Sequence, residues 1–200
     1  TWGPAREPED VDRAAALIEQ TYQRHGYPAT DPAVLATTIL AQRRWFGEAN
    51  HMLLVCREED RLVGAVTGFG NGSQWVVSML GLDYSVDRRY SLYFNLGYYL
   101  TMEYAVRRGA TSIGYGIEAL HAKLLRGMSL QPKWALVEPP EAAGGTWSRA
   151  VREHNLRSVR RLNETFGERV ADAVTAQWSP HAPPGTEHVR STPVVRSNAR

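Results

Sequence analysis

The sequence predicts an α/β (α+β) fold, in which a mixed sheet has helices on both faces and an extra helix follows at the C-terminal end. Three observations predict it. Two amphipathic helical segments come first, three strand-like segments follow, and a helical segment separates the third strand from the fourth. Because a helix joins those two strands, they can pair parallel, whereas strands joined by short turns pair antiparallel. The predicted order is α-α-β-β-β-α-β-α-β.

Two helices open the predicted fold. Residues 9–24 carry apolar side chains at three- and four-residue steps and begin with acidic residues, which favours a helix. A second helix begins at Asp31 and Pro32, because Asp caps helix N-termini and Pro fits the first helical turn. It ends near Gly47.

Five strands are expected after these helices. Residues 52–56 and 61–69 are short apolar segments on either side of a charged turn, which predicts a hairpin. A Gly-Asn-Gly-Ser turn then leads into a third strand over 74–82. The fourth and fifth strands are expected over 111–115 and 133–137.

The remaining segments are predominantly helical. The strongest helical pattern covers 91–108, and a short helix is expected over 117–126. A further helix over 146–166 combines an apolar stripe with five arginines, which would contact RNA phosphates or lie in solvent while the stripe docks on protein. A short helix is expected over 168–178, and 179–200 is expected to be a disordered tail.

Composition limits the classes of protein that fit. Of 200 residues, 43% are hydrophobic and 22% are charged, which is typical of a globular chain. The single cysteine, Cys56, excludes an intrachain disulfide and a cysteine-based zinc cluster, and a cytoplasmic location is expected. The net charge of +2 excludes a nucleic-acid binder that relies on charge alone, and membrane insertion is not expected. The expected domains are 1–140, a helical extension over 141–178 and the tail.

The order of elements resembles the GNAT N-acyltransferase fold, in which two central parallel strands splay apart and hold the pantetheine arm of an acyl donor. Residues 93–99 and the segment around Glu103 look like the central helix of the FemAB-like branch. Further matches to that branch follow at similar spacing: Arg108-Gly109, Gly114-Tyr115-Gly116, Glu118, Lys123, Arg126-Gly127 and Pro132. The resemblance covers residues 9–138, and it is specific over 90–134.

This resemblance implies an N-acyltransferase that moves an activated acyl group from an acyl-CoA donor to a primary amine of a small molecule or peptide. The family's glycine-rich donor turn is absent, since 87–91 contains no glycine. That departure supports an alternative, an amide-forming transferase of the FemAB type that uses aminoacyl-tRNA and so binds tRNA. A non-catalytic GNAT-like binding module of a larger chain is the second alternative. No resident cofactor or metal is expected, and a homodimer is considered.

Charged residues supply the first group of candidate site residues. Glu118 is the candidate base, and Lys123 and Arg126 are candidates for binding the donor, as the resemblance implies. Arg88 and Arg89 precede the central helix, where two guanidinium groups can clamp a diphosphate. The alternatives are a polar network under the sheet for the first three residues and a solvated basic loop for the arginine pair.

Tyrosines and further polar residues complete the candidate site. Tyr98 and Tyr115 are chosen as candidates for the general acid or for substrate binding at the edge of the splayed strands. Glu103 lies on the apolar stripe of a helix, so its carboxylate is either partnered or has a raised pKa that suits base chemistry. His121 shares a helix face with the candidate base, and Asp83 follows the third strand; the alternatives are an idle histidine and a turn-forming aspartate.

Overall fold

The computed structural model contains two compact units, Thr1–Ile117 and Glu118–Arg200, and each is described by itself. The first unit therefore ends before the predicted boundary at residue 140. The structure describes the following residues: 1–5, 8–116, 119–130 and 144–167. The predicted strand over 133–137, the predicted helix over 168–178 and the predicted tail lie outside them.

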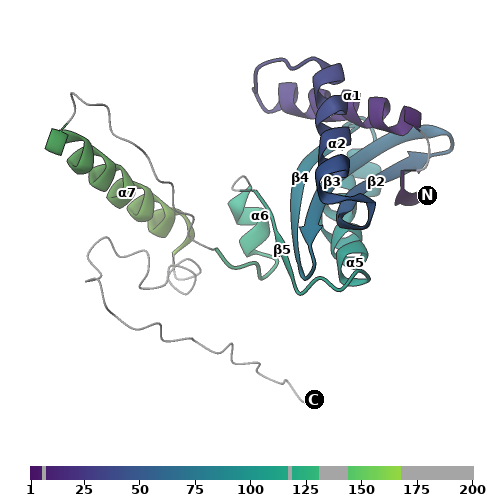
Figure 1. Cartoon of the computed structure of the whole chain (residues 1–200). Coiled ribbons are helices and arrows are strands. Elements are labelled where there is room, and N and C mark those ends of the chain that lie inside the picture. The colour runs from purple at the N-terminus through teal and green to yellow at the C-terminus, as the bar shows by residue number, and fades with distance from the viewer. Residues whose placement is uncertain (6–7, 117–118, 131–143, 168–200) are drawn as a thin grey trace. The chain divides into compact units, whose positions relative to one another are not determined.

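The first unit is a five-stranded sheet with helices on both faces (Figure 1). Its elements follow in this order: β1 (Trp2–Pro4), α1 (Pro8–Arg24), α2 (Pro32–Phe46), η1 (Glu48–Asn50), β2 (His51–Glu58), β3 (Arg61–Asn71), β4 (Gln74–Leu82), α3 (Asp87–Tyr90), α4 (Leu92–Phe94), η2 (Asn95–Leu100), α5 (Thr101–Val106) and β5 (Ser112–Gly114). The strands are adjacent in chain order, with β1 to β4 antiparallel and β5 parallel to β4. The predicted mixed sheet is confirmed.

Each face of the sheet has its own hydrophobic core. On one face, Ile18 of α1 and Ile39 of α2 are almost completely buried against β2, β3 and β4. On the other face, Leu92 and Leu96 pack with Leu82 of β4. Because successive residues of a strand point to opposite faces, β4 contributes side chains to both cores.

The two predicted helices at the start of the chain are confirmed, and so are the predicted ends of the second. The Asp31 carboxylate accepts a hydrogen bond of 2.9 Å from the backbone N–H of Ala33, as an N-cap residue does. At the other end Gly47 has a φ of 76°, a left-handed conformation that a side chain disfavours.

The predicted helix over 91–108 is present over 92–106, but its middle is a π-helix and not an α-helix. Ser91, with a φ of 49°, separates it from α3, and α4 then leads through the π-helix η2 into α5 without a gap. Residues five apart lie about 140° apart around an α-helix, but the wider turn of a π-helix brings them onto one side. Tyr93 and Tyr98 are therefore neighbours, and the Thr101 hydroxyl donates to the Leu96 carbonyl at 2.7 Å.

Strand β1 has no counterpart among the predicted elements. Trp2 pairs with Cys56 and Pro4 pairs with Leu54 on the edge of the sheet. A three-residue strand that contains Gly and Pro has no alternating pattern, so only its pairing with β2 identifies it.

The second unit contains α6 (Leu120–Leu124) and α7 (Gly144–Phe166). Helix α6 is shorter than the predicted helix over 117–126, and α7 confirms the predicted helix over 146–166. In the described ranges of both units, every helix is too short or too polar to pass through a lipid bilayer.

Candidate active site

Strands β4 and β5 pair over only three residues. They pair only where Gln74, Trp75 and Val76 face Ser112, Ile113 and Gly114. Strand β4 then continues through residues 77–82, and over this stretch no described residue of β5 pairs with it. The edge of β4 along 77–82 is therefore not paired with described residues of β5, and we call this edge the wedge. The predicted splay of the two strands stays a prediction.

A bulge in β4 marks the beginning of the wedge. Thr67 pairs with Met79 and Gly68 pairs with Val77, so Ser78 is an extra residue in β4. An extra residue bends its strand and increases the local twist, which turns β4 away from its neighbour. The Gln42 side chain donates to the Ser78 hydroxyl at 3.0 Å and so ties the bulge to α2.

The wedge leaves backbone groups of β4 without a neighbouring strand. The N–H of Asp83 donates to the Val63 carbonyl of β3 at 2.9 Å, whereas the N–H of Leu82 donates away from β3, to the Thr21 hydroxyl of α1, at 2.9 Å. Backbone direction alternates along a strand, so Leu80, two residues before Leu82, also directs its N–H toward the wedge. The Leu80 amide is thus placed to donate to a ligand there.

Tyrosines surround the narrow end of the wedge. Tyr115 directly follows the last paired residue of β5, and its ring centre lies 5.2 Å from that of Tyr98. The Tyr98 side chain is only 3% exposed, and its hydroxyl lies 2.9 Å from the Tyr93 hydroxyl. Burial raises the pKa of Tyr115 to about 12, and its buried hydroxyl has no hydrogen-bond partner in the part of the chain that the structure describes. Tyr98 and Tyr115, two separate candidates from the sequence, therefore lie beside each other.

The last turn of α1 closes the wide end of the wedge. Tyr84, two residues after β4, shares a hydrogen bond of 3.1 Å with the His25 ring, and the Arg24 guanidinium lies 4.2 Å from its ring centre. Burial raises the pKa of Tyr84. Sequence reasoning missed Thr21, His25 and Tyr84, because no motif links the end of a first helix to the end of a third strand.

Comparison with known proteins finds similar structures but no similar sequences. No family model matches the sequence, and no curated protein matches it. The structure is similar to that of a possible acetyltransferase from Clostridium difficile 630, with 16% identity over 70% of this chain and 96% of that chain and a TM-score of 0.54. It is also similar to a mutant BH1408 protein from Bacillus halodurans, with 16% identity over 70% of this chain and 99% of that chain and a TM-score of 0.52. A probable acetyltransferase matches at 15% identity over 71% of this chain and 98% of that chain, with a TM-score of 0.51.

The chain has the GNAT acetyltransferase fold. The identities are low, so the likeness establishes this fold and leaves activity to be argued from the site. The FemAB-like branch predicted from the sequence stays a prediction.

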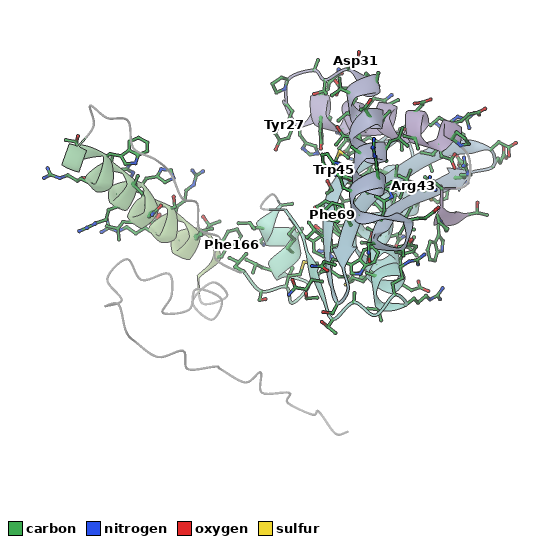
Figure 2. All side chains as sticks on the ribbon, in the orientation of Figure 1. Tyr27, Asp31, Arg43, Trp45, Phe69 and Phe166 are labelled. Carbon is green, nitrogen blue, oxygen red and sulfur yellow. The ribbon has the colours of Figure 1, made fainter. Side chains whose placement is uncertain are left out.

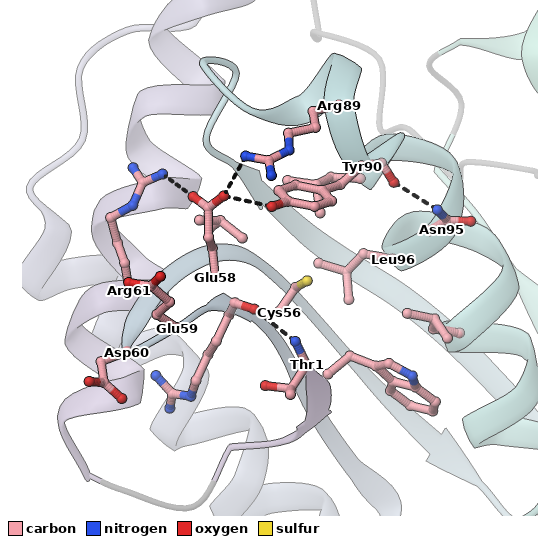
Figure 3. A pocket seen from close by; sticks show the side chains of 15 residues that line it. Thr1, Cys56, Glu58, Glu59, Asp60, Arg61, Arg89, Tyr90, Asn95 and Leu96 are labelled. Carbon is pink, nitrogen blue, oxygen red and sulfur yellow. Dashed lines mark hydrogen bonds and ion pairs between the residues drawn. The ribbon is translucent and has the colours of Figure 1, made fainter.

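In this GNAT fold, two predicted site residues belong to a network at the β2–β3 turn. Asp83 accepts from the N–H of Ser85 at 2.9 Å and pairs with Arg61 at 2.5 Å, and hydrogen bonds from Ser85 are the main reason that the pKa of Asp83 is lowered. Arg89 pairs with Glu58 at 3.1 Å (Figure 3). Asp83 thus has the geometry of a turn-forming aspartate. Arg88, the other arginine of the predicted phosphate clamp, is exposed on α3.

The cavity drawn in Figure 3 lies apart from the tyrosines. It has a volume of about 950 Å³, and its lining includes Val63, Leu92, Leu96 and the charged turn that carries Glu58. None of the three wedge tyrosines lines this cavity. The candidate active site is instead the wedge, where β4 has an unpaired edge beside Tyr98 and Tyr115.

The Glu103 carboxylate was expected either to have a partner or to have a raised pKa, and the structure shows a partner. It forms an ion pair with Arg107, the residue that directly follows α5, and its side chain is 41% exposed. The surface position differs from the expected apolar surroundings, because the π-helix shifts the stripe that a continuous α-helix would present.

The other predicted charged residues belong to the second unit or lie outside the described residues. Glu118 lies outside them. The His121 ring stacks on Phe166 at 6.3 Å, and Arg126 donates to the Ala122 carbonyl at 2.7 Å. Lys123 lies in α6. Among the residues that are described, no three His, Cys, Asp or Glu side chains gather in a way that could hold a metal ion.

Proposed function

We propose that this protein is an N-acyltransferase that moves an acyl group from an acyl-CoA donor to a primary amine. The observation that carries the proposal is the wedge: an open strand edge, with the Leu80 N–H directed into it and Tyr98 and Tyr115 at its narrow end. A thioester placed along this edge can accept a hydrogen bond where a fifth strand would otherwise pair.

The Leu80 N–H would stabilise the reaction's tetrahedral intermediate. As the amine nitrogen attacks the carbonyl carbon, the carbonyl oxygen gains negative charge, and a fixed donor at that point lowers the barrier. The intermediate collapses when the carbon–sulfur bond breaks, which gives an amide and a thiolate. Holding the amine beside the thioester is the other contribution of the site, because it removes the entropic cost of their encounter.

The leaving thiolate needs a proton, and Tyr98 is the proposed donor. Its hydroxyl lies beside that of Tyr93, which can share charge through their 2.9 Å hydrogen bond as the proton leaves. Tyr115 would hold a substrate group: its high pKa keeps the phenol protonated at neutral pH, and its buried hydroxyl can donate. Burial thus favours the protonated form that the role of Tyr115 requires.

Glu118 remains the proposed base that takes the proton from the attacking amine, with His121 beside it in the chain. The proposed contacts to the donor phosphates are Arg88, Lys123 and Arg126. Arg88 is supported by its exposure on α3, near the end of β4, whereas Arg89 is engaged by Glu58. Asp83 as a substrate contact and Glu103 as a proton carrier have less support, because each carboxylate already forms an ion pair with an arginine.

One observation favours the alternative donor, aminoacyl-tRNA. The five arginines of α7 are all exposed, and arginines on a helix can contact RNA phosphates. The five side chains are Arg149, Arg152, Arg157, Arg160 and Arg161. The two donors are distinguished by direct binding.

The decisive experiment measures thermal unfolding with coenzyme A, acetyl-CoA or a minihelix mimic of aminoacyl-tRNA. A ligand that binds only the folded protein stabilises it, by about 2.7 kcal/mol at a hundred times its dissociation constant. We expect a rise in melting temperature with acetyl-CoA and none with the minihelix. A rise with the minihelix alone would establish the alternative, and no rise with any of the three would support the non-catalytic module.

Release of free coenzyme A in the presence of a panel of primary amines then tests the chemistry. Tyr98→Phe and Glu118→Gln should each lower turnover by about 10²-fold or more while the melting temperature is kept. Tyr27→Phe is the matched control, because Tyr27 is 44% exposed on the loop before α2 and should keep full turnover. Turnover at the normal rate in Glu118→Gln would remove that residue from the mechanism.

A further inference from the structure

The Glu58 carboxylate, at the end of β2, binds three side chains at once (Figure 3). It accepts a hydrogen bond from the Tyr90 hydroxyl at 2.6 Å, and it pairs with Arg61 at 2.9 Å and with Arg89 at 3.1 Å. The hydrogen bond from Tyr90 is the main reason that the pKa of Glu58 is lowered, so the carboxylate is charged at neutral pH. One carboxylate thus connects the start of β3 with α3, which comes about thirty residues later in the chain.

Arg61 extends these contacts to the loop between β4 and α3. Besides Glu58 it pairs with Asp83, the residue that follows β4, at 2.5 Å. The Asp83 carboxylate also accepts from the backbone N–H of Ser85 at 2.9 Å, so the loop backbone is included. We call Glu58, Arg61, Asp83, Arg89 and Tyr90 the turn network. It holds the segment from Asp83 to Tyr90 at both of its ends.

Helix α3 depends on such contacts for its orientation. It has four residues, none of them is buried, and its N-cap makes no side-chain hydrogen bond. An isolated helix of this length is not stable in water. The Asp87 carboxylate accepts from the Tyr93 N–H at 2.9 Å and so anchors the start of α3, whereas the turn network anchors its end.

The turn network leaves Arg88 available. Successive residues of an α-helix lie about 100° apart around its axis, so Arg89 and Tyr90 both reach Glu58 only when Arg88 points to a different side. Arg88 is exposed, and it has no ion pair with any residue that the structure describes. Its guanidinium can therefore bind an anion from outside the chain, and a phosphate is a good match for its geometry.

We infer that Glu58 is a positioning residue of the donor site, which holds α3 so that Arg88 faces the phosphates of coenzyme A. The inference rests on the proposed function, because it assumes an acyl-CoA donor. Glu58 cannot bind a phosphate itself, since like charges repel and its oxygens already have three donors. It acts through α3, without touching the donor.

Charge alone predicts the opposite effect of removing Glu58. A carboxylate near an anion site weakens binding of the anion, so neutralising it should tighten the binding of coenzyme A. Neutralisation also releases Arg89, which could then add a contact to the donor. If Glu58 positions α3, its neutralisation must instead weaken binding. The sign of the change therefore distinguishes positioning from electrostatics.

Two other carboxylates of the chain provide matched controls. Glu59, the next residue of the same turn, is exposed and has no ion pair in the described ranges. Glu48 pairs with Arg43 at 2.5 Å. Arg43, labelled in Figure 2, belongs to α2, which packs on the face of the sheet opposite to Tyr90. Glu59→Gln thus removes the same charge from the same turn, and Glu48→Gln breaks a surface ion pair remote from α3.

Titration calorimetry with coenzyme A tests the inference. Glu58→Gln and Tyr90→Phe should each raise the dissociation constant roughly five- to tenfold, because both remove a hydrogen bond of the charged carboxylate. The KM for acetyl-CoA should rise by the same factor while kcat is kept. Tyr90→Phe changes no charge, so its effect cannot come from electrostatics. Glu59→Gln and Glu48→Gln should leave the dissociation constant unchanged.

A double-mutant cycle tests whether Glu58 acts through Arg88. Arg88→Ala should weaken binding of coenzyme A, and adding Glu58→Gln should then have no further effect. A general structural role of Glu58 would weaken binding equally in both backgrounds. Thermal unfolding of each variant verifies that it is folded.

The outcomes separate this inference from the proposed function. If the wild type binds coenzyme A, the inference is overturned by unchanged or tighter binding in Glu58→Gln and Tyr90→Phe. An undiminished effect of Glu58→Gln in the Arg88→Ala background would overturn it as well. In those cases the proposed function stands. A wild type that binds no coenzyme A would overturn both.

Discussion

Gly81 is a position where one added methyl group should strongly destabilise the fold. It lies in β4 and pairs with Ala65 of β3, and its α-carbon faces the backbone of α1. A β-carbon at this position would lie 2.5 Å from the Ile18 backbone nitrogen and 2.7 Å from the Leu17 carbonyl carbon, whereas ordinary contacts are 3.4–4 Å. Backbone atoms cannot rotate away, so Gly81→Ala must move α1 from the sheet by about 1 Å.

The expected cost follows from this displacement. Adding a methyl group to a well-packed core typically costs about 1–3 kcal/mol. With a urea dependence of about 2 kcal/mol per molar, the unfolding midpoint should fall by about 0.5–1.5 M. The substitution should also lower turnover, because α1 carries Thr21, whose hydroxyl accepts the Leu82 N–H at the wide end of the wedge.

Gly114→Ala is the matched control for this experiment. Gly114 is also a strand glycine, but a β-carbon there would meet Trp75 and Val76 at 3.7 Å, which is ordinary contact. Its midpoint should stay constant or rise, since alanine restricts the unfolded chain. Equal midpoints for Gly81→Ala and the wild type would refute the argument that α1 rests directly on β4.

Two further predictions concern buried ionisable groups. Between pH 10 and about 12 the unfolded chain loses the Tyr115 proton while the folded protein keeps it, so the free energy of unfolding falls as the pH rises. Tyr115→Phe should make this fall shallower in urea titrations at several alkaline pH values, and an unchanged slope would contradict the burial of that phenol. Asp10 is 1% exposed and paired with Arg57, so Asp10→Ala should cost about 3–5 kcal/mol. Glu9→Ala breaks an exposed pair and should cost under about 1 kcal/mol, and equal effects of the two in denaturant unfolding would contradict this account.

Local patterns account for the elements that sequence reasoning found. The turn over 70–73 and the apolar run over 74–82 predict β4 with the bounds that the structure has. Asp31 and Gly47 mark the two ends of α2, because capping depends on the few residues next to a helix end. Tyr98 and Tyr115 were also candidates from the sequence, each chosen for the edge of the splayed strands that the resemblance implies, whereas their contact was not predicted.

Patterns of this kind do not extend to contacts between distant segments. The bulge at Ser78 exists only as a register shift against β3, and the π-helix replaces an α-helix whose apolar spacing the sequence retains. The partners of Arg89 and Asp83 come from the β2–β3 turn, more than twenty residues earlier in the chain. Sequence reasoning therefore expected these two side chains to be available to ligands.

The sequence by itself determined the fold class, the order of the helices and strands from α1 to β5, and the presence of tyrosines near the end of a central strand, because these depend on periodicity and on neighbouring residues. Only the tertiary structure decided where the pairing of the two parallel strands ends, that the Leu80 amide faces the unpaired edge, and that Thr21 lies at the far end of that edge. Those features depend on strand register and helix packing, which arise when residues far apart in the chain come together and exclude water.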